Sequence, residues 1–325
     1  MTSGVHRKIL KLLEEAENVH IEGERDPSRF FFMRPSGFPY CGLRKLLEAH
    51  QTLTAEEGRL SNLASEYFTS VGTAAHSAFQ KFMGRMGTIV GDYKCPVCED
   101  VKPFATFSRC KKCKVDRHYD ELELRYKNMV VGHTDGLFRL EPEKGKDSIH
   151  YVIDYKTSAY YKTKDKKKTP YIYPLKNNVQ QIKMYVVLLE ACFGIKVDGY
   201  ILVYLGRDLP LGKNGQHVVT VKMSEKEKAT CRKRLDRWVK VHRKVLRVRT
   251  PKDAEVVRKY KLCKSFADYR ENWMDEYSGC SIAPYCFDDK KLTKVITERL
   301  TKYPIFPIIE QAPPNIRKIL ETKND

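Results

Sequence analysis

The sequence lacks the features of membrane and secreted proteins. No stretch approaches the roughly 20 consecutive apolar residues of a membrane-spanning helix, so no membrane partner is expected. The opening stretch, MTSGVHRKILKLLEEAENVH, has no apolar core of the signal-peptide kind, and its apolar residues fit one helix face. We therefore expect a cytoplasmic protein, in which cysteines serve as metal ligands or core residues more often than as disulfides.

Acidic residues are in the minority. The 325 residues include 41 Asp and Glu against 60 Lys and Arg, a formal charge of +19. This balance favours a polyanionic partner such as nucleic acid, although a soluble protein with solvated lysines would show it too. Hydrophobic residues make up 42% of the chain, which is enough for a core and excludes wholesale disorder.

Four of the ten cysteines form two CxxC pairs in the segment KCPVCEDVKPFATFSRCKKCK. The pairs are Cys95 with Cys98 and Cys110 with Cys113. Two such pairs at this separation predict a structural zinc site, a zinc ribbon. The lysines and arginine around it favour contact with nucleic acid, or they are solvated residues on a purely structural element.

Hydrophobic patterns predict a mixed α/β (α+β) fold, in which a central mixed sheet is flanked by helices. Helical patterns dominate residues 1–84. The expected strands and later helices follow in chain order: strands 121–126, 129–140 and 149–156, helix 177–193, strands 199–206 and 217–223, and helix 224–248.

The segment YVIDYK ends a buried strand with an acid and a base. Asp154 and Lys156 point to the same side of an extended strand, and the Tyr155 carbonyl remains available as a ligand. A short polar linker separates this strand from the preceding one, so the two are expected to pair and to bring Asp135 near Asp154. Two converging carboxylates favour a bound Mg²⁺ or Mn²⁺, beside which a lysine can orient or activate water.

Asp135 followed by Asp154-Tyr155-Lys156 resembles the D…DxK form of the PD-(D/E)XK nuclease motif, in its RecB-like branch. GTAAHSAF places His76 as in the GxxxH motif of that branch.

QIKMY gives Gln181 and Tyr185 the spacing of the branch's QxxxY motif on the helix after the core strands. Each element alone has an ordinary explanation, such as an i,i+4 pair on a helix. Together they follow the family's order over about residues 70–190.

The resemblance implies a restriction-endonuclease-like core and a Mg²⁺- or Mn²⁺-dependent DNA nuclease. It implies His76, Asp135, Asp154 and the Tyr155 carbonyl as metal ligands, Lys156 as the residue that positions or activates water, and Gln181 and Tyr185 as supporting residues. The expected activity is exonucleolytic, on DNA ends or single strands, in recombination, repair or phage DNA metabolism, with a helicase or recombination protein as a further partner. The alternatives are a nucleic-acid-binding module with a vestigial site and a sequence- or structure-specific endonuclease.

Some RecB-type nucleases, such as AddB and the CRISPR adaptation nucleases, carry an iron–sulfur cluster on one cysteine before the core and three after it. Cys41, Cys263, Cys280 and Cys286 are similar to that set and imply a 4Fe–4S cluster. The family's cysteine three residues before the final pair is Tyr277 here, so Cys263 takes its place. Zinc at the same ligands and ordinary buried thiols are the alternatives.

A lysine-rich tract follows the DYK triplet. It contains Lys162, Lys164, Lys166, Lys167 and Lys168. Interleaved with tyrosines, these cations are expected to contact a substrate strand, whereas a flexible solvated loop is the alternative.

The predicted domain organisation has four parts. An N-terminal helical region (1–70) supplies Cys41, the nuclease core comprises 71–92 and 119–223, and the zinc ribbon (93–118) is inserted within it. A C-terminal helical region (224–325) supplies the other cluster cysteines.

Overall fold

The computed structural model describes most of the central part of the chain. The described ranges are 63–140, 148–158, 176–206, 216–248 and 286–302, with shorter pieces at 21–23, 31–37, 41–44, 59–61, 161–162 and 168–169 and a few further positions. No helix in these ranges is long and apolar enough to cross a membrane.

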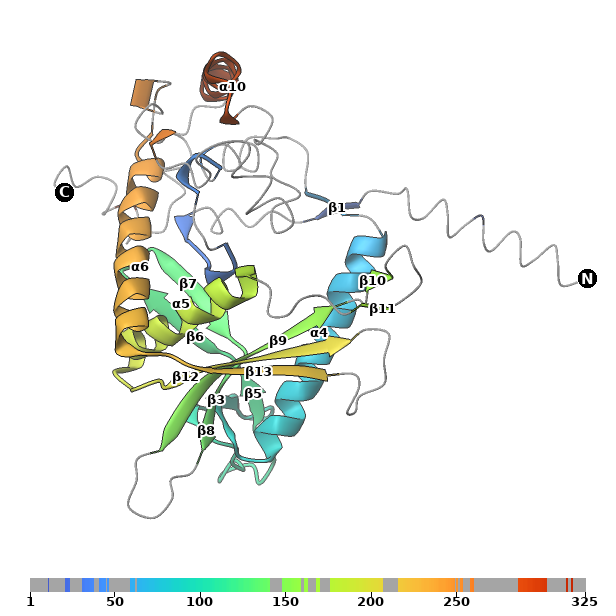
Figure 1. Cartoon of the computed structure of the whole chain (residues 1–325). Coiled ribbons are helices and arrows are strands. Elements are labelled where there is room, and N and C mark those ends of the chain that lie inside the picture. The colour runs from blue at the N-terminus through green and yellow to red at the C-terminus, as the bar shows by residue number, and fades with distance from the viewer. Residues whose placement is uncertain are drawn as a thin grey trace, which may run out of the picture.

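A seven-stranded mixed sheet forms the centre of the fold (Figure 1). Its strand order is β13-β12-β9-β8-β3-β4, with β5 also paired to β3. The strands are β3 (Ile89–Lys94), β4 (Val101–Ala105), β5 (His118–Asp120), β8 (Gly136–Leu140), β9 (Ile149–Ser158), β12 (Gly199–Gly206) and β13 (Gln216–Lys222). β9 and β12 are parallel and the other pairs antiparallel, so the predicted mixed α/β class is confirmed.

Helices cover both faces of this sheet. Helix α4 (Leu63–Arg85) packs on one face, where Phe79 contacts the cluster containing Ile153 and Tyr155. Helix α5 (Lys176–Phe193) packs on the other face, and α6 (Glu225–Leu246) packs against α5. A further helix, α10 (Asp289–Lys302), lies near the C-terminal end. The period-2 alternation of a strand puts Tyr155 towards α4 and its neighbours Asp154 and Lys156 towards α5.

The segment predicted as one strand over 129–140 is two strands. β7 (Val130–Thr134) pairs with β6 (Leu122–Tyr126), whereas β8 pairs with β9 in the predicted hairpin. Asp135 stands between β7 and β8, at the point where the chain changes partner.

The N-terminal part also differs from the helical prediction. Ile21–Gly23 (β1) pairs with Arg59–Ser61 (β2), and Pro35–Gly37 forms a 3₁₀ turn, η1. Helix α4 begins at Leu63, so it runs across the domain boundary placed at residue 70.

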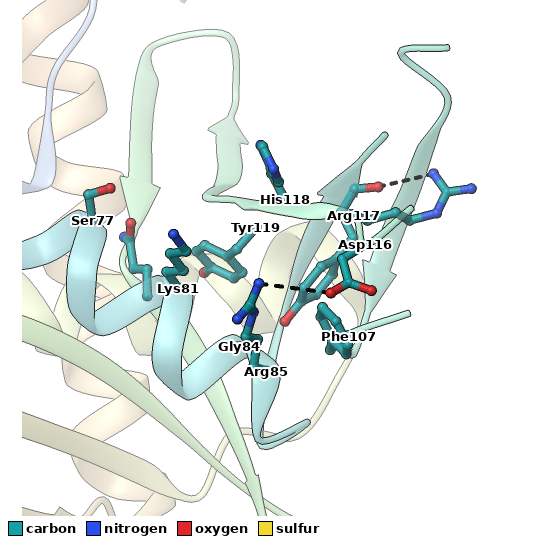
Figure 2. A pocket seen from close by; sticks show the side chains of 11 residues that line it. Ser77, Lys81, Gly84, Arg85, Phe107, Asp116, Arg117, His118 and Tyr119 are labelled. Atoms are coloured by element: carbon teal, nitrogen blue, oxygen red, sulfur yellow. Dashed lines mark hydrogen bonds and ion pairs between the residues drawn. The ribbon is translucent and has the colours of Figure 1, made fainter. Parts of the chain in front are cut away.

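The cysteine-rich segment is an extension of the central sheet. β4 and β5 both pair with β3, which itself pairs with β8. Helix α4 faces this segment, and Arg85 lies 3.8 Å from Asp116 across the gap between them (Figure 2). The insert is therefore held in place by both the sheet and the helix.

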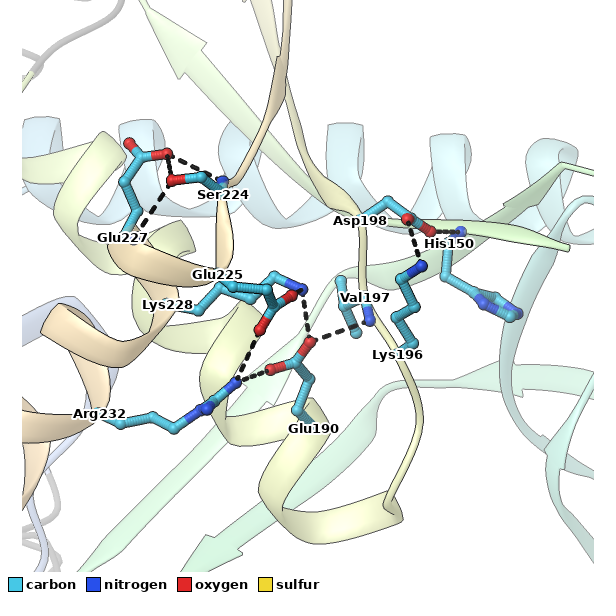
Figure 3. A network of polar contacts seen from close by, with 10 residues as sticks. All are labelled: His150, Glu190, Lys196, Val197, Asp198, Ser224, Glu225, Glu227, Lys228 and Arg232. Carbon is cyan, nitrogen blue, oxygen red and sulfur yellow. Dashed lines mark hydrogen bonds and ion pairs between the residues drawn. The ribbon is translucent and has the colours of Figure 1, made fainter. Parts of the chain in front are cut away.

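A buried ion pair fastens α5 to α6 (Figure 3). Lys228 is 1% exposed, and its ammonium lies 2.8 Å from Glu190 and 2.8 Å from Glu225. Glu190 also accepts hydrogen bonds from Arg232 at 2.6 Å and from the Val197 N–H at 3.2 Å. Burial raises the pKa of Glu190, but its hydrogen bonds with Lys228 and Arg232 outweigh this, and the net effect is a lowered pKa.

Replacing Glu190 by Ala should lower the free energy of unfolding by about 3 kcal/mol, because it leaves a buried ammonium short of a partner. Glu225→Ala, at a side chain that is 72% exposed, is the matched control and should cost less than about 1 kcal/mol. The lowered pKa means that the Glu190 contribution is present above about pH 4.3 and is lost as the pH falls below it. Urea unfolding of both variants at pH 7 measures the difference, and equal values would contradict the buried pair's role.

Candidate functional site

Asp135 lies where two β-ladders meet. In the β6–β7 ladder Leu122 faces Thr134, and in the β8–β9 ladder Gly136 faces Ile153. If each register is extended by one residue, Asp135 stands opposite an acid in each ladder.

These acids are Glu121 on one side and Asp154 on the other. Opposite residues of an antiparallel pair lie about 5 Å apart, so three carboxylates gather at the junction. Like charges at this spacing repel unless a cation or a proton intervenes.

The Asp135 carboxylate is fixed from several directions. Its Oδ2 accepts a hydrogen bond from the Tyr155 N–H at 2.7 Å and lies 3.4 Å from Nδ1 of His76 on α4. The Tyr119 hydroxyl donates to the Asp135 backbone carbonyl at 2.8 Å. Burial lowers the pKa of His76, but the hydrogen bond and charge of Asp135 outweigh it and raise the pKa overall.

Asp154 is buried and incompletely hydrogen-bonded. It is 2% exposed, and its Oδ1 accepts a hydrogen bond from Lys156 at 3.0 Å. Its Oδ2 lies 2.8 Å from the same ammonium but outside hydrogen-bonding geometry, and it has no other partner among the described residues. A buried carboxylate oxygen without a hydrogen bond is uncommon, and a cation would satisfy it.

The charges of this pair are strongly coupled. Burial raises the pKa of Asp154 to about 6, against the opposing effect of Lys156. Burial also lowers the pKa of Lys156, but the adjacent Asp154 outweighs it, so the pKa is raised and the ammonium form is favoured.

Helix α5 presents the predicted Gln181 and Tyr185 to this region. The Gln181 amide donates to the Tyr185 hydroxyl at 3.4 Å, and burial raises the Tyr185 pKa. A second contact on this helix was missed by sequence reasoning. Asn178, one turn before Gln181, donates to the Tyr204 hydroxyl at 3.1 Å, and Tyr204 is the β12 partner of Lys156.

Glu121 was also missed, and no local pattern marks it. Its carboxylate accepts a 2.8 Å hydrogen bond from Gln80, which follows His76 by one helical turn on α4. Burial raises the pKa of Glu121, and the negative charge of Asp135 adds to the rise. Only the strand register, which the sequence does not state, brings this acid to the junction.

The structure thus brings His76, Asp154, Lys156 and Tyr185 within electrostatic reach of Asp135, and Gln181 joins them through its hydrogen bond to Tyr185. Their ligand atoms are more widely spaced than those of the cysteines: within the described ranges, only one set of three or more such residues has ligand atoms all within 4.8 Å of one another. That set is Cys95, Cys98, Cys110 and Cys113.

The four cysteines can hold a metal ion, as predicted. The two pairs have the same backbone geometry: the Cys98 N–H approaches the Cys95 sulfur at 3.5 Å, and the Cys113 N–H approaches the Cys110 sulfur at 3.5 Å. The residue after each pair, Glu99 or Lys114, has a positive φ. The Cys98 and Cys110 sulfurs are 3.7 Å apart, close to the roughly 3.8 Å edge of a tetrahedron with 2.3 Å metal–sulfur bonds.

The thiols are electrostatically unequal. The backbone N–H of Cys98 lowers the pKa of Cys95 to about 6, whereas hydrogen bonding with the Cys98 thiol and burial raise the pKa of Cys113 to about 12. The Cys95 thiol therefore ionises readily, whereas the Cys113 thiol resists ionisation. Four thiolates together require a cation among them.

The remaining predicted site residues are only partly described. Cys286 is buried in the main core and Cys41 packs against that core, whereas Cys263 and Cys280 lie outside the described residues. Lys162 and Lys168 stand in a two-stranded ladder, β10 (Tyr161–Lys162) with β11 (Lys168–Thr169), within a segment expected to be a loop. Lys164, Lys166 and Lys167 lie outside the described residues. The 4Fe–4S cluster and the tract's contact with substrate remain predictions.

Comparison with protein-family models and with curated proteins gives no match for this chain.

Replacing Cys95 and Cys98 together by serine should remove one metal ion per chain and destabilise the insert by more than about 2 kcal/mol, because the metal is coupled to local folding. Cys192→Ser, on helix α5 and outside the four-cysteine set, should leave that metal in place. Elemental analysis of the purified variants, with thermal unfolding, measures both effects. Unchanged metal content in the double variant would refute the site.

Proposed function

We propose that this protein is a divalent-metal-dependent DNA nuclease of the PD-(D/E)XK type, in its RecB-like branch. The observation that carries the proposal is the junction at Asp135, where three carboxylates (Glu121, Asp135 and Asp154) gather beside a histidine from α4 and a partly buried lysine, Lys156. The mixed sheet flanked by helices is consistent with the core that the motif resemblance implies.

The donor set suits a hard divalent cation. The Asp154 oxygen without a hydrogen bond, the Asp135 carboxylate and the His76 imidazole would hold Mg²⁺ or Mn²⁺, with the Tyr155 carbonyl assisting. The bound ion would supply Lewis acidity towards a phosphodiester.

The chain's own residues would orient the reactants. Lys156, whose raised pKa keeps it protonated near neutral pH, is suited to donate hydrogen bonds to water or to a phosphate oxygen. We infer that it acts through its charge, and that it is less suited to act as a free base. Tyr204, which pairs with Lys156 across the β9–β12 ladder and is hydrogen-bonded to Asn178, would fix its position.

The metal at the four cysteines is proposed to be zinc. Sulfurs within 4.8 Å of one another surround a single tetrahedral ion, whereas a multi-iron cluster places several metal atoms between its thiolates. The ribbon would then stabilise the insert and leave the chemistry to the Asp135 junction.

Asp154→Asn and Lys156→Ala should each reduce Mn²⁺-dependent cleavage of a labelled DNA by at least about 100-fold, because each removes a charge from the reacting centre. The affinity for the same DNA should change less than about threefold, because contacts of other cations with the DNA phosphates supply most of the binding energy. Glu298→Gln on α10 and Lys196→Ala before β12, which remove the same charges at exposed side chains, are the matched controls. Wild-type protein that binds DNA but cleaves no DNA or RNA with any divalent ion would favour a binding module. Defined fragments from a plasmid would indicate an endonuclease.

Glu121→Gln should weaken Mn²⁺ binding by about tenfold, because it removes the third carboxylate beside Asp135. Glu123→Gln, two residues further along the same strand edge, is the control and should bind Mn²⁺ like the wild type. Calorimetric titration without DNA measures the ion affinity directly. Equal affinities for the two variants would exclude Glu121 from the cation site.

A further inference from the structure

A cleft lies between helix α4 and the cysteine-rich insert (Figure 2). Its volume is about 400 Å³. The lining residues that matter here are Ser77, Lys81 and Arg85 from α4 and Phe107, His118 and Tyr119 from the insert side. None of these residues belongs to the predicted nuclease motifs.

The α4 wall of the cleft continues directly from His76. Ser77, Lys81 and Arg85 recur every four residues, so they lie on one face of the helix. At 1.5 Å per residue, the row from Ser77 to Arg85 extends about 12 Å away from the proposed metal ligand. A strand bound at the proposed metal and running along α4 would meet this row next.

The cations of the cleft are available to a ligand. Among the described residues no carboxylate lies within ion-pair distance of Lys81, which is exposed. Arg85 lies 3.8 Å from Asp116, and both side chains are about half exposed, so this pair is weak and easily exchanged for a phosphate. Arg117 differs: it is 8% exposed and is already held by Asp100.

The insert side of the cleft is aromatic. Phe107 is partly exposed and meets the buried Tyr93 edge to face, with ring centroids 6.2 Å apart. The ring centroids of Tyr93 and Tyr119 are 5.6 Å apart, and the Tyr119 hydroxyl donates a hydrogen bond to the backbone carbonyl of Asp135. This aromatic row fixes the floor of the cleft relative to the metal ligands.

We propose that this cleft binds an unpaired stretch of the nucleic-acid strand next to the cleavage site. Lys81 and Arg85 contact its phosphates and Phe107 stacks on a base. The inference rests on the proposed nuclease function and adds single-stranded substrate to it. A duplex keeps its bases paired and stacked inside, so its phosphates could contact the cations but no base face would be exposed for Phe107 to stack on.

The cations are tested by salt dependence. Each phosphate contact in single-stranded DNA contributes about 0.7 to the slope of log affinity against log salt concentration, so Lys81→Ala with Arg85→Ala should reduce the slope by about 1.4. The matched control, Lys226→Ala with Lys233→Ala, removes the same charge from the exposed face of α6 and should keep the wild-type slope. The measurement is fluorescence anisotropy of a labelled oligo-dT 20-mer with Ca²⁺ in place of Mn²⁺. A wild-type slope for the cleft variant, or an equal loss in the control, would overturn the proposal.

The aromatic contact has a separate signature. Phe107→Ala should weaken binding of the same oligonucleotide about tenfold with an unchanged salt slope, because stacking releases no counterions. Phe107→Leu retains the apolar volume, so a well-folded Phe107→Leu protein with the same loss isolates stacking from insert stability. Wild-type affinity in Phe107→Leu would overturn the stacking role.

The two proposals fail differently. A reduced slope in the cleft variant together with no metal-dependent cleavage by the wild type would retain the cleft and reject the nuclease. Normal cleavage by a cleft variant that keeps wild-type affinity and slope would retain the nuclease and reject the cleft.

Discussion

The contact on which the site depends is the hydrogen bond from the Tyr155 N–H to the Asp135 carboxylate, 2.7 Å long and buried. It occurs where the chain leaves one β-ladder and enters another, so a side chain takes the place of a regular backbone partner. An unsatisfied buried N–H would cost a few kcal/mol, which makes an acceptor at this position a structural requirement. The same requirement fixes a carboxylate beside Asp154 and within reach of His76.

The two faces of the sheet carry different kinds of side chain at this point. Tyr155 fills the α4 face and packs against Phe79, with ring centroids 5.3 Å apart, while Asp154 and Lys156 project to the α5 face. One strand therefore supplies core packing in one direction and charged groups in the other. The energy of burying those charges is offset within the pair itself, by the ammonium that lies 2.8 Å from Asp154 Oδ2.

Local patterns in the sequence were enough to predict the β8–β9 hairpin, helix α5 and the paired cysteines. Each of these is encoded within about 20 residues by alternation, helical periodicity or ligand spacing. The break at Asp135 was not predictable, because both halves of 129–140 are good strands and only their different partners separate them. Glu121 and the contact between Asn178 and Tyr204 depend on register between distant segments, which a single sequence does not express.

The cysteine-rich insert connects the four-cysteine site to the Asp135 junction. The four cysteines, which could hold a metal ion, lie beside β4 and β5, and both strands pair with β3. β3 in turn pairs with β8, the strand that begins directly after Asp135. The same insert forms one wall of the cleft beside α4. A segment this short cannot bury enough apolar area to hold such a wall rigid, so a metal staple is a reasonable solution. Because Tyr119 reaches from the insert to the Asp135 carbonyl, loosening the insert would also loosen the junction.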